Sequence, residues 1–202
     1  MGELVQAANA LRDGLPVILP TDTVYGLTAS CYREPPVERL RRLKGTPPAQ
    51  PIAILASDFE VVLDAVPELR GRAAVLARAL LPGRLTLILP NPAKRYRWLT
   101  GPDPTKIGIR VPDLPPASRA VLDRVGAVAA TSANVHGGRD PARPEDIPEE
   151  IWKGAAALVD GGELPGTPST VVDLTEAQPR VLREGAVPAD EALATIARVA
   201  SE

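Results

Sequence analysis

Proline occurs along the whole chain, and this distribution limits the fold more than any other feature of the sequence. The chain has 23 prolines among its 202 residues, roughly twice the ~5 % of an average protein. Proline removes a backbone donor and breaks helix interiors, which argues against a bundle of long helices. We therefore expect many short elements that are joined by rigid turns.

Apolar periodicity predicts where these short elements lie. Helical spacing of apolar residues predicts helices over residues 3–12, 36–44, 58–65, 68–81, 116–124 and 189–200. Apolar or alternating runs predict strands over residues 17–19, 51–56, 85–89, 106–111, 127–130, 155–159, 170–174 and 180–183. Because strands and helices intermix, an α/β fold with a mixed sheet is predicted, with residues 137–150 as a long loop.

The length and composition are those of one globular domain. A chain of this length buries roughly 70 % of its unfolded surface. The single cysteine, Cys31, excludes an intrachain disulfide and suits a reducing compartment. No run approaches the ~18 apolar residues of a membrane helix, and the N-terminus lacks the apolar core of a signal peptide. We expect a single domain over residues 1–202 that is soluble and cytoplasmic and has no membrane partner.

Charge is unevenly distributed. The net charge is −2, yet residues 145–202 hold 12 acidic and 4 basic side chains. Residues 1–144 are therefore basic, which suggests an anionic ligand on that part of the chain. A surface that is merely patchy is the alternative.

Several common chemistries have no support in the sequence. His136 is the only histidine, so no histidine-rich metal site is expected, and a lone cysteine makes a zinc site improbable. The phosphate-loop, dinucleotide-binding and nucleophile-elbow motifs are all missing. An enzyme with this sequence is expected to work by positioning and charge neutralisation rather than through a covalent nucleophile.

Small polar residues follow two apolar strands and precede a third. They are Thr21, Asp22 and Thr23 after the first strand, Ser132 and Asn134 after another, and Thr167, Ser169 and Thr170 before a third. Polar groups at such positions must bond to backbone, water or ligand, because burying them unpaired is costly. Ligands tend to sit at the carboxyl ends of strands in open α/β sheets. Turns that cap a helix or loop are the structural alternative.

Basic residues near strand and helix ends supply the expected countercharge. Lys44 ends a predicted helix, where it can turn inward. The arginines within residues 39–42 of the same helix are expected to form mostly a solvated face. Arg110 and Arg183 end predicted strands, and each suits either a carboxylate or phosphate clamp or an ion pair. The aromatic cluster at residues 96–98 is expected to pack ordinarily rather than stack a base.

Seven short blocks match one known family in order. They are PTDTVYGL at 20–27, Lys44 with Pro47 and Pro51-Ile52, PGRLTLIL at 82–89, IRVP at 109–112, SAN at 132–134, STVVD at 169–173 and LREG at 182–185. On these blocks, over about residues 3–187, the chain resembles the Sua5/YciO/YrdC family of threonylcarbamoyl-AMP synthases. The resemblance implies a twisted open α/β sheet with flanking helices and a concave ligand face.

The resemblance also implies a reaction. Family members convert L-threonine, bicarbonate and ATP, with Mg²⁺, into threonylcarbamoyl-AMP and pyrophosphate, by nucleotidyl transfer. Partner proteins then transfer the threonylcarbamoyl group to adenosine 37 of tRNA. The implied partners of this chain are thus the three substrates, together with tRNA and tRNA-modification proteins.

Residue roles follow from the matching blocks. By resemblance, the threonine pocket is formed by Thr23, Tyr25, Arg110 and Thr170, with Arg110 on the carboxylate. Nucleotide and phosphates are assigned to Lys44, Ser132, Asn134 and Arg183. Lys44 and Arg110 are the catalytic candidates, and the resemblance assigns no protein ligand to a metal.

Some positions depart from the family pattern. Thr46 stands where the family has an arginine, Gln50 where histidine or asparagine is common, and His136 and Asp140 where serines are frequent. These departures favour an alternative, a YciO-like paralogue that binds nucleotide without synthase activity. A non-catalytic RNA-binding protein of the same fold and an interaction module are further alternatives.

Overall fold

Short helices and strands alternate along the chain in the computed structural model, which describes residues 2–201. The strands are β1 (Val17–Pro20), β2 (Tyr25–Ser30), β3 (Ala53–Leu55), β4 (Leu85–Pro90), β5 (Lys106–Arg110), β6 (Val128–Ser132), β7 (Ala157–Leu158), β8 (Thr170–Asp173) and β9 (Arg180–Arg183). The helices are α1 (Gly2–Arg12), α2 (Glu34–Lys44), α3 (Phe59–Ala65), α4 (Gly71–Leu80), α5 (Pro116–Val125), α6 (Glu149–Gly154) and α7 (Ala189–Ala200), with a 3₁₀ turn η1 (Pro144–Asp146).

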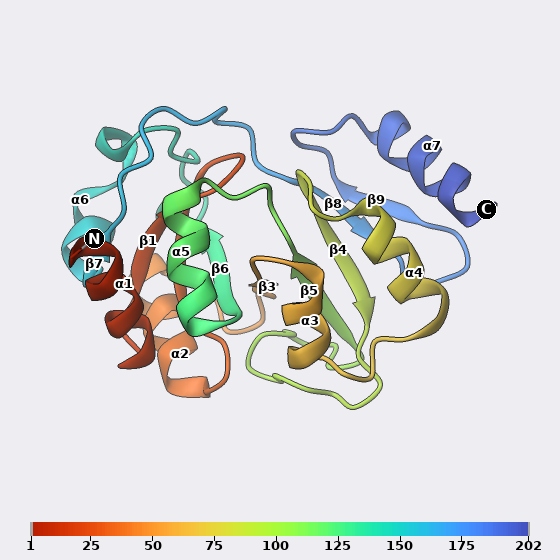
Figure 1. Cartoon of the computed structure of the whole chain (residues 1–202), viewed down its shortest axis with the longest axis horizontal. Helices are drawn as coiled ribbons and strands as arrows, with labels where there is room; N and C mark the ends of the chain where they lie inside the picture. Colours follow the sequence, from red (N-terminus) through yellow and green to blue (C-terminus); the bar gives the residue numbers. More distant parts are fainter. Residues whose placement is uncertain (1, 202) are drawn as a thin grey trace.

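The strands form one open mixed sheet in the order β7-β1-β2-β6-β3-β5-β4-β8-β9. Parallel pairs join β1 to β7, β3 to β5 and β4 to β8, and the other neighbours are antiparallel. Helices flank this sheet along its length (Figure 1). The predicted α/β fold with an open mixed sheet is thus confirmed.

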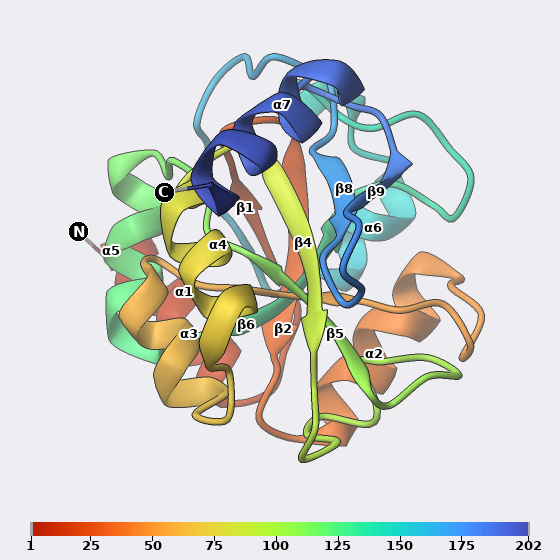
Figure 2. The same ribbon diagram turned by 90° about the vertical axis from the view of Figure 1, so that its right-hand side faces the viewer.

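The strand register defines two faces of the sheet. The first face carries Val17, Leu19, Leu55 and Val128, which pack with the buried residues of α1 and α5. The second face carries residues that pack with α2, α3, α4 and α7; they include Ile18, Leu27, Ile54, Leu87 and Ile109. Because sheets twist, α1, α5, α3 and α4 nevertheless all lie on one side of the molecule (Figures 1 and 2).

The first face is covered by helices over only part of its width. Beyond α1 and α5 it continues across β6, β3, β5, β4 and β8, where alternate residues line a cavity. Leu55 and Ala130 belong to both regions, because they contact the hydrophobic layer under α1 and α5 and also line the cavity. No helix within residues 2–201 is long and apolar enough to span a bilayer.

Two elements were not predicted, and three predicted elements are shorter in the structure, among them the strand over 51–56, which is reduced to β3. The two elements that were not predicted are β2, over residues 25–30, and α6, which begins at the end of the predicted loop. β2 lies between β1 and β6, and its Thr28 hydroxyl donates to the Val17 carbonyl at 2.7 Å, so a polar residue is accommodated inside the sheet. The helix predicted over 68–81 is shorter, as α4, and the strand over 155–159 shrinks to β7.

Candidate functional site

A cavity of about 420 Å³ lies on the first face. Its floor is built from small residues on adjacent strands, Ala130 of β6, Ala53 of β3 and Gly108 of β5. A Cβ added at Gly108 would lie 3.3 Å from the Ala53 Cβ and 3.5 Å from Ile88 Cδ1. Small side chains therefore keep the middle of this sheet face hollow.

The cavity is cationic. Lys44, Arg110 and Arg183 line it, and no aspartate or glutamate of the described chain is among the lining residues. Two of the three cations come from the basic part of the sequence, residues 1–144. An anionic ligand suits such a lining, because positive groups in a partly enclosed site concentrate negative charge.

Arg110 is held through one nitrogen of its guanidinium. Its Nη2 donates to Asp22 Oδ1 at 2.6 Å and to the hydroxyls of Thr21 and Thr23. Its Nε is buried and has no hydrogen-bond partner within residues 2–201. Burial lowers the pKa of Arg110, and Asp22 opposes that shift. An arginine binds a carboxylate or phosphate through the N–H groups of its guanidinium. Nη1 makes none of these bonds and is not among the buried unpaired atoms of the described residues, so it is the nitrogen left for a ligand.

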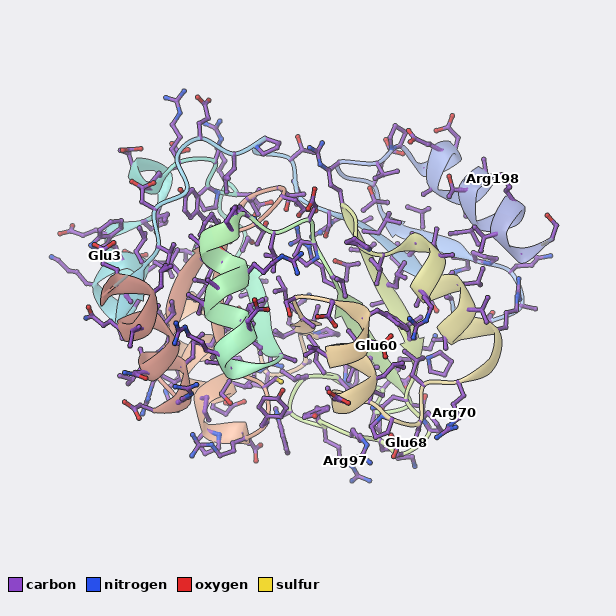
Figure 3. All side chains as sticks on the ribbon, in the orientation of Figure 1. Glu3, Glu60, Glu68, Arg70, Arg97 and Arg198 are labelled. Atoms are coloured by element: carbon purple, nitrogen blue, oxygen red, sulfur yellow. The ribbon has the colours of Figure 1, made fainter. Side chains whose placement is uncertain are left out.

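The ion pair between Arg110 and Asp22 is more buried than other ion pairs of the molecule. Glu60 and Glu68, which are labelled in Figure 3, pair with Arg78 at 2.7 Å and with Arg95 at 2.5 Å, and the side chains of both pairs are largely accessible to solvent. Such exposed pairs contribute little to stability. In the ion pair between Arg110 and Asp22, the Arg110 side chain is 12 % exposed and the Asp22 side chain is 5 % exposed. Removing either residue therefore leaves the other as an unpaired buried charge.

Lys44 lies where α2 ends beside the cavity. Gly45 at the helix end has φ +71, a conformation that glycine adopts without strain, and there the chain turns toward the cavity. The ammonium donates to the Ser132 carbonyl at 2.6 Å, to the Asn134 carbonyl at 3.1 Å and to the Asn134 side-chain oxygen. Burial lowers the pKa of Lys44 to about 8, and nearby Asp140 opposes that shift. The inward turn expected of Lys44 is present.

Ser132, Asn134 and Arg183 complete the polar lining. Ser132 Oγ donates to Asn134 Oδ1 at 2.7 Å, so both residues join the Lys44 network at the end of β6. Arg183 lies on the opposite rim, where its Nη2 donates to the Ser169 carbonyl at 2.8 Å. The structure thus brings together five predicted site residues around one cavity: Lys44, Arg110, Ser132, Asn134 and Arg183.

Three other predicted site residues do not line the cavity. Thr23 lies behind it as a partner of Arg110. The Tyr25 hydroxyl donates to the Gly162 carbonyl at 2.8 Å and accepts from the Gly161 N–H at 2.9 Å, which holds the loop after β7. Thr170 points away because Ser169 and Val171, its neighbours in the strand, line the cavity instead. Its hydroxyl accepts from the Gly185 N–H at 2.9 Å and so fixes the turn after β9.

Three residues that shape the site were not among the predicted site residues, although Thr46 was noted as a departure from the family pattern. Asp22 was expected only as one of several polar residues after β1, yet it is the ion-pair partner of Arg110. Thr46 lines the cavity with a buried hydroxyl that has no partner within the described residues. Gly108 forms the floor, which alternation in the predicted strand 106–111 would have placed on the same face as Arg110.

The aromatic cluster at residues 96–98 lies outside the cavity. Tyr96 and Trp98 pack edge to face with ring centroids 5.9 Å apart, and the Trp98 indole N–H donates to the Cys31 carbonyl at 2.9 Å. Neither ring is among the lining residues. The expectation of ordinary packing is confirmed.

A family model, Sua5_yciO_yrdC, with the description "Telomere recombination", matches residues 9–185. A threonylcarbamoyl-AMP synthase of Pyrococcus abyssi is 36 % identical over 186 residues, which cover 92 % of this chain and 54 % of that protein. The chain therefore spans about half the length of this relative.

Two solved structures share the architecture. The crystal structure of P. abyssi Sua5 complexed with L-threonine aligns with a TM-score of 0.86 at 34 % identity, covering 96 % of this chain and 57 % of that one. The crystal structure of Escherichia coli YciO aligns with a TM-score of 0.81 at 27 % identity, covering 94 % of this chain and 92 % of that one.

Proposed function

The chain belongs to the Sua5/YciO/YrdC family, and from this we propose that it makes threonylcarbamoyl-AMP and pyrophosphate from L-threonine, bicarbonate and ATP. The observation that carries the proposal is the cationic cavity, which Arg110 lines and in which its Nη1 makes no bond within residues 2–201. A carboxylate is a group that a guanidinium N–H binds well. The P. abyssi relative that is named a threonylcarbamoyl-AMP synthase and the Sua5 complex with L-threonine support the same reading.

The proposed reaction requires the protein to hold two anions, the carboxylated threonine and ATP, next to each other. In the proposed sequence, the threonine amine and bicarbonate condense with loss of water, and the resulting N-carboxylate attacks the α-phosphorus of ATP. The bond from that phosphorus to the bridging oxygen breaks, and its electron pair leaves with pyrophosphate. Arg110 would orient the threonine carboxylate, while Lys44 and Arg183 would neutralise phosphate charge. No residue forms a covalent bond to substrate.

The lining does not fit a dedicated magnesium site. Mg²⁺ takes oxygen ligands, usually one or two carboxylates plus substrate phosphates. No carboxylate of residues 2–201 lines the cavity, and no group of three or more His, Cys, Asp or Glu side chains gathers within those residues. We therefore treat Mg²⁺ as part of the Mg·ATP substrate and assign it no ligand from the chain.

Pyrophosphate release tests the proposal. We expect release from ATP that requires both L-threonine and bicarbonate, with a product whose mass is that of threonylcarbamoyl-AMP. Omitting either co-substrate is the control. ATP binding without release under any of these conditions would contradict the synthase.

The pH dependence of ATP binding is a second expected result. Because burial lowers the pKa of Lys44 to about 8, the ammonium is charged at pH 7 and loses its proton as pH rises through that value. Loss of this charge removes a charge-assisted contact, so ATP affinity should fall about 10-fold from pH 7 to pH 9.5. Calorimetric titrations across this range measure it. A Lys44→Met protein, which has no such proton, should bind weakly and with a flat profile; an equally steep profile in the variant would contradict the assignment.

A nucleotide-binding paralogue without synthase activity is the second candidate. It is favoured by Thr46, which stands in the cavity wall where the synthase pattern has a cation, and by the near-complete overlap with E. coli YciO. The pyrophosphate assay separates the two candidates. If the synthase proposal holds, transfer of the threonylcarbamoyl group to tRNA by partner proteins is the step that would follow.

A further inference from the structure

Arg41 is a buried arginine within an otherwise solvated run. Its side chain is 3 % exposed, whereas Arg42 beside it is exposed. Its Nη1 donates to the carbonyls of Pro47 at 3.1 Å and Gln50 at 2.6 Å, and its Nη2 donates to the Trp98 carbonyl at 2.9 Å. The expectation that the arginines of residues 39–42 form mostly a solvated face is therefore wrong for Arg41. A buried guanidinium that spans three carbonyls fixes the backbone that carries them.

The carbonyls bonded by Arg41 belong mainly to the segment 46–50, which forms one wall of the cavity. Thr46 and Gln50 line the cavity, and the Thr46 N–H donates to the Arg41 carbonyl at 3.0 Å. Arg41 thus holds this segment through both its backbone and its side chain. Prolines at positions 47 and 48 restrict the segment further.

The Thr46 hydroxyl is a polar group on this wall that has no partner within the described residues. Thr46 is 8 % exposed, and its Oγ1 is buried without a hydrogen-bond partner within residues 2–201. Leaving a buried hydroxyl unpaired is unfavourable, and such groups in native proteins usually meet water or a ligand. Because Lys44, Arg110 and Arg183 line the same cavity, the expected ligand atom is an anionic oxygen, to which the hydroxyl donates.

We propose that Arg41 is a positioning residue, which holds segment 46–50 as a cavity wall so that the Thr46 hydroxyl donates a hydrogen bond to an anionic oxygen of the bound nucleotide. This inference rests on the proposed function only in taking a nucleotide as the ligand. Arg41 itself does not line the cavity, so it affects ATP binding by fixing the conformation of segment 46–50.

A double-mutant cycle on ATP affinity tests the coupling. Titration calorimetry with ATP, without L-threonine, is carried out on the wild type, Arg41→Met, Thr46→Val and the double variant, with exposed Arg42→Met as the matched control. We expect each single change to weaken ATP binding about 10-fold, as loss of one hydrogen bond to a charged group does. The double variant should be about as weak as Arg41→Met alone, and Arg42→Met should match the wild type. Two independent effects that multiply, or no effect of Arg41→Met, would overturn the proposal.

Two further variants guard against a general loss of structure. Thr46→Ser keeps the hydroxyl and should bind ATP as the wild type does. Arg41→Lys keeps a charge but cannot span the three carbonyls, so it should bind as weakly as Arg41→Met while unfolding at a temperature closer to that of the wild type. If Arg41→Met does not fold, Arg41→Lys replaces it in the cycle.

The outcome is separable from that of the proposed function. ATP binding by the wild type without pyrophosphate release would contradict the synthase and leave the role of Arg41 intact. A wild-type protein that binds neither ATP nor pyrophosphate would overturn the inference about Arg41 and Thr46.

Discussion

Arg110→Met is expected to reduce threonine-dependent pyrophosphate release by about 100-fold or more, because truncating one partner of a buried charge pair costs about 2–5 kcal/mol. The lost interaction is the proposed one between the Arg110 guanidinium and the threonine carboxylate. ATP affinity should change much less, since Lys44 and Ser132 lie at the other end of the polar lining. Steady-state assays with varied L-threonine, and ATP titrations, measure the two effects separately.

Removing Arg110 also leaves Asp22 without its partner, and this needs a control. Asp22 is 5 % exposed and its Oδ2 accepts from the Asp113 N–H at 3.2 Å. An unpaired buried carboxylate destabilises a protein by roughly 3–5 kcal/mol, so Arg110→Met alone should unfold at lower temperature. Arg110→Met with Asp22→Asn should recover much of that stability without recovering activity. Recovery of activity in the double variant would show that Arg110 acts only by neutralising Asp22.

Lys44→Met should weaken ATP binding by about 100-fold, near the lower end of what loss of a buried charge contact costs. The ammonium both supplies charge and joins Ser132 to Asn134, so the change removes a cation and loosens the loop after β6. L-threonine affinity measured alone should change little, the reverse of the pattern for Arg110→Met.

The Lys44→Met protein is expected to fold but to be less stable than the wild type. Removing the ammonium takes this donor from the Ser132 and Asn134 carbonyls, and a buried acceptor left unpaired costs about 1–3 kcal/mol, although Ser132 keeps its own bond to Asn134. Lys153→Met on α6 is the matched control, because Lys153 is 72 % exposed. Equal loss of ATP and threonine affinity in Lys44→Met would mean that the two ligands do not have separate subsites.

The elements with strong apolar periodicity could be predicted from the sequence, because their side chains alternate between a core and solvent. β2 could not, since its first residues belong to a polar stretch and its Thr28 is satisfied only by the Val17 carbonyl of a neighbouring strand. α6 was missed for a different reason. A helix as short as Glu149–Gly154 has too few positions to show a period.

Only part of the candidate site could be predicted from the sequence. Lys44, Ser132 and Asn134 could be placed because strand and helix ends are visible in the sequence. The pairing of Asp22 with Arg110 could not be predicted, because the two residues are 88 positions apart and meet only through the sheet order. The burial of Arg41 could not be predicted either, because two of its three carbonyl partners lie in an irregular loop.

Leu55 and Ala130 serve the hydrophobic layer under α1 and α5 and the cavity at once. A change in the size of either side chain alters the shape offered to a ligand and the packing of the layer together. Divergence toward another substrate is therefore constrained at these two positions by the need to stay folded. Thr46 on its loop and Leu182 on the edge strand lie outside that layer. They are two positions at which a descendant of this chain can change its ligand without altering the packing of that layer.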